Sequence, residues 1–161
     1  MSITHEPALA DLQSIMDDCW ATFLGNVEPL EQVAPSSVEH AWTAAITISG
    51  GWQALVLMQF SDVAATEVAH RMLGMGPDEQ PVAEDLTDSL GELVNVIGGN
   101  VKSLMPGPSQ LSLPLVAQGT VTASVPGPAE LVETTRLDIS WLGQPVRLSI
   151  SAAAAEVDLA P

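Results

Sequence analysis

The chain has 161 residues, of which 47% are hydrophobic, 15% are charged and only 4% are aromatic. A chain of this length can bury a sizeable core, so we expect a single domain over residues 1–161. Its 20 acidic and 4 basic residues give a formal net charge of −16. Such a surface repels phosphate backbones and anionic lipids, which disfavours nucleic acids and membranes as partners.

A first helix is predicted over residues 7–24, with Thr4 as its N-cap, Pro7 in its first turn and Gly25 just beyond its end. The single cysteine, Cys19, lies on the apolar side of this helix and cannot form an intrachain disulfide. The N-terminal residues have no basic stretch followed by an apolar segment of membrane-spanning length. We therefore expect a cytoplasmic protein.

A β-hairpin is predicted after this helix. Residues 26–37 contain two prolines and are expected to form a loop. Apolar and polar residues then alternate over residues 42–49, and a second apolar segment occupies residues 52–60. The glycine pair at residues 50–51 supplies the tight turn between the two strands.

Two helices follow the hairpin. The first is capped by Ser61 and ends near Leu73, and an acidic loop over residues 77–79 leads into the second. The second helix is predicted over residues 85–104. Its apolar face consists of residues that recur at helical spacing: Leu86, Leu90, Leu93, Val94, Ile97, Val101 and Leu104.

The second helix also has a polar stripe. Asp88, Glu92 and Asn95 stand four and three residues apart, so their side chains emerge from neighbouring turns. Gly98 and Gly99 follow, and each glycine costs roughly 1 kcal/mol relative to alanine in a helix interior. A solvated face is the common explanation of such a stripe. The glycines could accommodate either a neighbouring helix or strand of the same fold or a binding partner.

The C-terminal part is predicted to be mostly β-structure. Pro-Gly-Pro at residues 106–108 ends the helix, and strands are expected over residues 111–115 and 120–125. A final hairpin turns at residues 142–145. Strands that are grouped around helices, rather than alternating with them, indicate an α+β fold with two layers, in which helices pack on one face of a mostly antiparallel sheet.

Residue spacing excludes several kinds of catalytic site. A cysteine phosphatase needs an arginine six residues after its cysteine, but the residue six positions after Cys19 is a glycine. The three histidines are scattered, so no metal site is expected. Glycine-rich phosphate loops and a Gly-x-Ser-x-Gly elbow are missing as well. The sequence therefore contains no evident nucleophile.

Three segments resemble the CheX-like chemotaxis phosphatases, a family related to CheC. Residues 91–102, GELVNVIGGNVK, are similar to the Glu-x-x-Asn helix of that family. Residues 111–114 are similar to its Leu-Ser-Leu-Pro strand, and residues 41–52 to its first hairpin. The resemblance spans roughly residues 38–116 and implies a CheC-like fold.

The resemblance implies an enzyme that hydrolyses the aspartyl phosphate of a CheY-like response regulator. Asn95 would orient the attacking water, and Glu92 would pair with a lysine of the regulator. Other candidates for contact with the regulator are Asp88, Gly98, Gly99 and Lys102.

The resemblance also implies which cofactors and partners to expect. The phosphatase would need no cofactor of its own, because Mg²⁺ would sit in the active site of the partner regulator. A homodimer is favoured. Two alternatives stay open: a non-enzymatic module whose helix binds a regulator or flagellar-switch partner, and a structural dimer-forming domain. The intact Glu92 and Asn95 argue against a decayed site.

Overall fold

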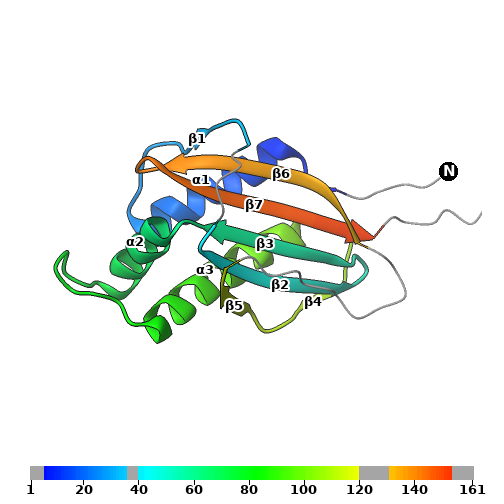
Figure 1. The fold of residues 1–161 in the computed structure, drawn as a ribbon. Coiled ribbons are helices and arrows are strands. Elements are labelled where there is room, and N and C mark those ends of the chain that lie inside the picture. The colour runs from blue at the N-terminus through cyan, green and yellow to red at the C-terminus, as the bar shows by residue number, and fades with distance from the viewer. Residues whose placement is uncertain (1–5, 36–39, 120–130, 154–161) are drawn as a thin grey trace, which may run out of the picture.

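Three helices cover one face of an antiparallel sheet (Figure 1). The structure, a computed structural model, describes residues 6–35, 40–119 and 131–153. Within these ranges the helices are α1 (Leu9–Leu24), α2 (Asp62–Leu73) and α3 (Ala83–Ser103). The two-layer α+β fold predicted from the sequence is confirmed.

The described part of the sheet has seven strands in the order β1-β6-β7-β3-β2-β4, and β5 is also paired with β2. All pairs are antiparallel. The strands are β1 (Glu31–Gln32), β2 (Trp42–Gly50), β3 (Ala54–Phe60), β4 (Ser109–Leu111), β5 (Leu115–Gln118), β6 (Leu131–Trp141) and β7 (Gln144–Ala153). The segment that follows α3 along the chain therefore forms one edge of the sheet, while β1 forms the opposite edge.

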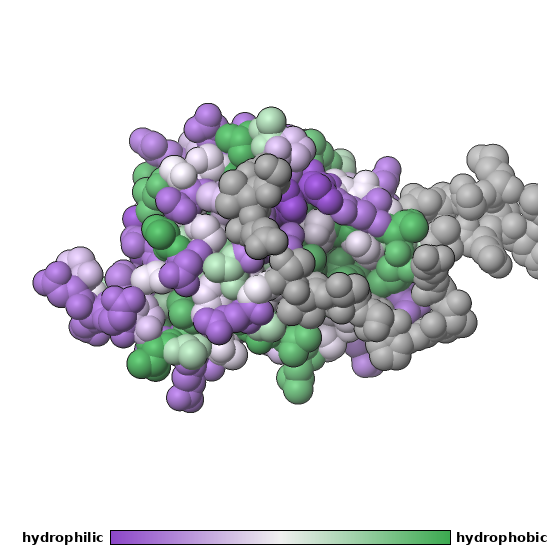
Figure 2. Space-filling model, viewed as in Figure 1, coloured by the Kyte–Doolittle hydropathy of each residue, from purple (hydrophilic) through white to green (hydrophobic). Residues whose placement is uncertain are grey.

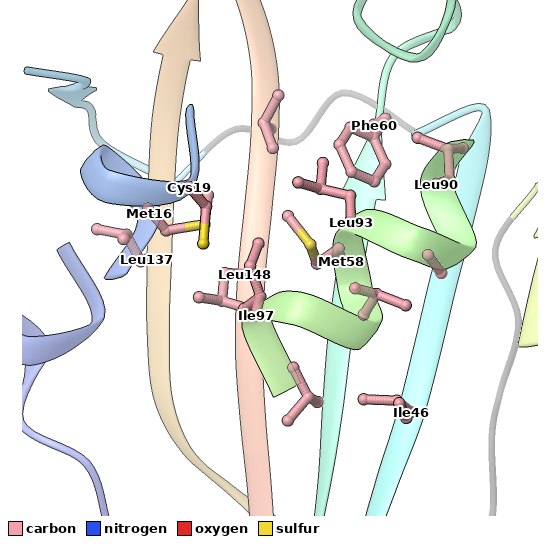
Figure 3. Packing of buried hydrophobic residues seen from close by; sticks show 14 of the residues in the cluster. Met16, Cys19, Ile46, Met58, Phe60, Leu90, Leu93, Ile97, Leu137 and Leu148 are labelled. Atoms are coloured by element: carbon pink, nitrogen blue, oxygen red, sulfur yellow. The ribbon is translucent and has the colours of Figure 1, made fainter. Parts of the chain in front are cut away.

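The apolar face of α3 packs mainly on β2 and β3 (Figure 3). Leu90, Leu93 and Ile97 are fully buried, and they lie over the sheet close to Met58 and Phe60 of β3. Burying an aliphatic side chain of this size contributes roughly 1.5–3 kcal/mol. These contacts hold α3 firmly and so fix the direction of its polar stripe.

Two short strands pair with the edge of β2 that faces away from β3. The single continuous strand predicted over residues 111–115 is therefore wrong. β4 pairs with the end of β2, and β5 pairs with its beginning. Residues 112–114 lie between these two strands and belong to neither. Pro114 has no N–H to donate and restricts the residue before it, which explains the interruption. The strand predicted over residues 120–125 lies outside the described residues.

Two N-terminal predictions are also corrected. Helix α1 begins at Leu9 with Ala8 as its N-cap, so Pro7 precedes the helix and does not lie in its first turn. The predicted cap Thr4 lies outside the described residues. The loop expected over residues 26–37 contains strand β1, which pairs with β6.

Both hairpin turns differ slightly from their predicted lengths. The final hairpin turns at Leu142 and Gly143, whose φ angles of 53° and 75° are typical of a two-residue type I′ turn. In the first hairpin, β3 begins at Ala54 instead of residue 52. The turn of this hairpin contacts the segment that follows α3: the N–H of Gly51 donates to the carbonyl of Pro108 at 2.8 Å.

Candidate functional site

Helix α3 carries the candidate site and has charged residues at both ends. The Asp85 carboxylate accepts a hydrogen bond from the N–H of Val82 at 2.9 Å, which satisfies a polar group at the helix start. Glu84 and Asp85 lie in the first turn and Lys102 in the last, an arrangement that suits the helix dipole. The helix is therefore well defined on both sides of its polar stripe.

Glu92 and Asn95 extend from the side of α3 that faces away from the core. Glu92 is exposed and Asn95 is half-buried. Within the residues that the structure describes, neither side chain makes a hydrogen bond or an ion pair. The same holds for Asp88, which is exposed one turn before Glu92. Two carboxylates and one carboxamide are thus available for a ligand or a partner.

A groove of about 410 Å³ lies beside the acidic part of the stripe. We call it the α3–β5 groove; its lining residues are Thr87, Asp88, Gly91, Glu92, Pro114 and Val116. A Cβ atom at Gly91 would stand 3.6 Å from both the Pro114 and Val116 side chains. These are ordinary van der Waals distances, so a methyl group would fit at Gly91, and Pro114 packs against the helix next to Glu92.

The sequence analysis did not predict this groove, although one notable residue on each side of it can be recognised in the sequence. Gly91 precedes the candidate acid, and Pro114 interrupts an apolar segment. The sequence does not predict that Gly91 and Pro114 lie close together, because this results from the pairing of β5 with the beginning of β2.

The two glycines after Asn95 have different surroundings. Gly98 is buried, and a Cβ atom there would lie 2.7 Å from Cγ2 of Ile46 in β2. The alternative of a neighbouring strand of the same fold accounts for this glycine, so no partner contact is needed to explain it. Gly99 is half-buried, and its Cβ would meet only Leu111, at 3.9 Å.

Lys102 is partly engaged by the fold. Its ammonium group donates to the carbonyl of Ser109 in β4, at 3.4 Å, and the side chain is half-buried. This contact joins the end of α3 to the edge of the sheet. A contact of Lys102 with a partner stays a prediction.

The Cys19 thiol and the Thr87 hydroxyl are poorly suited to act as nucleophiles. Burial raises the pKa of the Cys19 thiol to about 11, and the nearby Asp18 adds to this shift, so the sulfur is protonated near neutral pH. Thr87, the hydroxyl-bearing residue of the α3–β5 groove, donates to the Ala83 carbonyl at 3.0 Å. Among the described residues, no three side chains of the metal-binding types are grouped together.

A second hollow of about 540 Å³ lies between the end of α1 and α2. Its charged side chains are already used by the fold. Arg71 pairs with Glu67 at 2.9 Å and donates to the Leu24 carbonyl at 2.9 Å. The guanidinium also lies 5.3 Å from the centre of the Trp141 ring. This hollow is therefore a poorer candidate than the α3–β5 groove.

No helix in the described part of the chain is long and apolar enough to cross a membrane.

Comparison with known proteins gives a family match and several structural matches. The family model of the chemotaxis phosphatase CheX matches residues 42–133. This segment contains the first hairpin, all of α3 and the α3–β5 groove. The comparison with curated proteins gives no match.

Three solved structures illustrate the likeness. CheX from Vibrio vulnificus is 18% identical with a TM-score of 0.70, and the match covers 92% of this chain and 99% of that one. CheX from Desulfovibrio desulfuricans is 17% identical with a TM-score of 0.67, covering 89% and 97%. The complex of CheX with CheY, BeF3 and Mg²⁺ from Borrelia burgdorferi is 16% identical with a TM-score of 0.69, covering 94% and 100%. At these identities the matches establish a shared fold.

Proposed function

Because the chain belongs to the family of the chemotaxis phosphatase CheX, we propose that it accelerates hydrolysis of the aspartyl phosphate of a CheY-like response regulator. The observation that carries this proposal is the state of two side chains on α3. Glu92 and Asn95 stand one turn apart on a firmly packed helix, and no described residue occupies their polar ends. A partner can therefore meet both groups at once.

The chemistry requires little more than a well-placed water. An aspartyl phosphate is a reactive mixed anhydride, and the regulator neutralises its charge with its own Mg²⁺ and lysine. The remaining barrier comes largely from bringing a water in line with the P–O bond. The amide of Asn95 can both accept and donate hydrogen bonds, which suits it to holding that water. It is neutral, so the phosphoryl oxygens do not repel it.

Glu92 has a different role in this proposal. Its carboxylate pairs with the regulator's lysine and fixes the position of α3 relative to the phosphoryl group. Asp88, one turn earlier, adds negative charge beside this contact. The Mg²⁺ belongs to the regulator, and the phosphatase contributes no metal. The CheX structure that was solved with CheY, BeF3 and Mg²⁺ supports the presence of Mg²⁺ in the regulator.

Release of phosphate from a phosphorylated receiver domain, measured with and without the protein, tests the proposal. The protein should increase the rate, and Asn95→Ala should remove at least about 100-fold of that increase, the scale expected for one oriented water. The fold should be preserved because the Asn95 side chain forms no hydrogen bond with the described residues.

Asn100→Ala is a matched control on the same helix. The Asn100 side chain donates to the Val96 carbonyl at 3.0 Å and lies 3.9 Å from the sulfur of Cys19, so it faces α1. This variant should keep full activity. A wild-type protein that binds the phosphorylated receiver without increasing phosphate release would instead be a non-enzymatic binding module, and the proposal would be wrong.

We also propose that the active form is a homodimer, as the resemblance to the family favours. Sedimentation equilibrium over a range of concentrations measures this directly. A mass that stays at 16.8 kDa, the value for one chain, would contradict it.

A further inference from the structure

The connection between β4 and β5 exposes an aliphatic side chain beside the α3–β5 groove. Leu113 is 89% exposed, the largest value among the exposed large hydrophobic residues of the described chain. Figure 2 shows hydrophobic side chains projecting from the lower edge of the molecule, where Figure 1 draws β4 and β5. A single exposed leucine is common on protein surfaces, so what distinguishes Leu113 is its place in the chain, directly before Pro114 of the α3–β5 groove.

Leu113 is presented by a connection that is fixed on both sides. On one side, Ser112 exchanges hydrogen bonds with Thr47 of β2: the Ser112 N–H donates to the Thr47 carbonyl, and its hydroxyl accepts from the Thr47 N–H, both at 2.9 Å. On the other side, Pro114 lies against α3 at Gly91. The backbone at Leu113 therefore loses little conformational freedom when a partner covers the side chain.

The position of Leu113 indicates which partner would cover it. Pro114, the next residue, lines the α3–β5 groove together with Asp88 and Glu92. A receiver domain that brings its phosphorylation pocket to Glu92 and Asn95 must extend well beyond these two side chains. The surface around that pocket would then meet the β4–β5 connection.

We propose that Leu113 is a docking residue, which contacts an apolar patch of the receiver domain beside its phosphorylation pocket while Glu92 and Asn95 enter that pocket. This inference rests on the proposed function. It assigns to Leu113 a share of the affinity and no part in the chemistry, because its side chain has no polar group.

Leu113→Ser tests the inference when kcat and KM are measured separately. KM for the phosphorylated receiver should rise about 10-fold, as expected from loss of most of a leucine's apolar contact. The Kd for a receiver loaded with beryllofluoride, a phosphoryl mimic, should rise by the same factor. At saturation kcat should stay within about twofold of the wild type, and Leu113→Met should restore KM.

Val27→Ser is the matched control. Val27 is 86% exposed, and it lies in the connection from α1 to β1, which forms the opposite edge of the sheet. This variant should leave KM and Kd unchanged. An unchanged Kd in Leu113→Ser would overturn the inference, as would a fall in kcat at constant KM. A change of oligomeric mass with unchanged Kd would also overturn it, since a second copy of the chain would then cover Leu113.

The two proposals fail in distinguishable ways. Equal phosphate release by the wild type and Asn95→Ala would overturn the proposed function, whatever Leu113→Ser does. Loss of activity in Asn95→Ala with normal Kd and KM in Leu113→Ser would overturn only the inference about docking.

Discussion

The two halves of the polar stripe on α3 share one helix face but differ in what surrounds them. In the N-terminal half, Glu92 and Asn95 have no partner among the described residues. In the C-terminal half, Gly98 is pressed against Ile46 and Lys102 donates to the carbonyl of Ser109. Helical spacing alone groups all four residues together. The contacts with β2 and β4 separate those that stabilise the fold from those that are available for a partner.

Replacing the charge of Glu92 should have the largest effect among the variants that probe this comparison. Glu92→Gln should raise KM for the phosphorylated receiver about 10- to 100-fold, because a hydrogen bond to a charged group contributes roughly 1.5–3 kcal/mol. Initial rates of phosphate release at varied receiver concentration give the value.

Glu84→Gln is the control for this charge change. Glu84 is an exposed acid in the first turn of the same helix and does not line the α3–β5 groove. Equal KM values in both variants would mean that Glu92 contributes only to the general negative charge.

Adding a methyl group to each glycine should have opposite effects on stability. Gly98→Ala should destabilise the protein by about 1–2 kcal/mol, since overpacking against the buried, β-branched Ile46 exceeds the gain in helix propensity. Gly99→Ala should stabilise it by about 0.5–1 kcal/mol, because only Leu111 is nearby. Urea unfolding gives both values. Stabilisation by Gly98→Ala would show that this packing does not explain the glycine.

The same pair of variants separates packing from docking at Gly99. If the regulator approaches α3 closely there, Gly99→Ala should raise KM while it stabilises the fold. An unchanged KM would remove Gly99 from the contact surface.

The smallest effect is expected at Lys102. Lys102→Met keeps the aliphatic stem and removes only the donor to the Ser109 carbonyl, so a loss of about 0.5–1 kcal/mol in unfolding free energy is expected. Because so small a loss of stability leaves the protein folded, a rise in KM for the phosphorylated receiver would return Lys102 to the partner surface. Thermal unfolding and KM measured on the same preparation distinguish the two roles.

The sequence predicts best what depends on local periodicity. The apolar repeat on α3 predicts a long helix, and Ser61 predicts the start of α2, where its hydroxyl accepts from the N–H of Ala64 at 3.1 Å. The alternation and the glycine pair likewise predict the first hairpin, but not its register: a two-residue turn at residues 50–51 would pair Trp42 with Gln59, whereas Trp42 pairs with Phe60.

Features that depend on contacts between distant segments could not be predicted. Pro114 explains the interruption at residues 112–114, but the pairing of β4 and β5 with the two ends of β2 depends on distant segments, and strand β1 forms only because β6 lies beside it. The different roles of Gly98 and Gly99 follow from the positions of Ile46 and Leu111. Nothing in a run of two glycines distinguishes one from the other.

The proposed function requires that the neutral amide of Asn95 places the attacking water. Asn95→Asp tests it most directly, because the carboxylate has the same shape but carries a negative charge and cannot donate a hydrogen bond when ionised. The measurement is the first-order decay of phosphorylated receiver at a saturating concentration of this variant. With Asn95→Asp we expect the receiver to decay at its intrinsic rate, and with Asn100→Asp at the wild-type rate. A rate for Asn95→Asp within about twofold of the wild type would contradict the proposal.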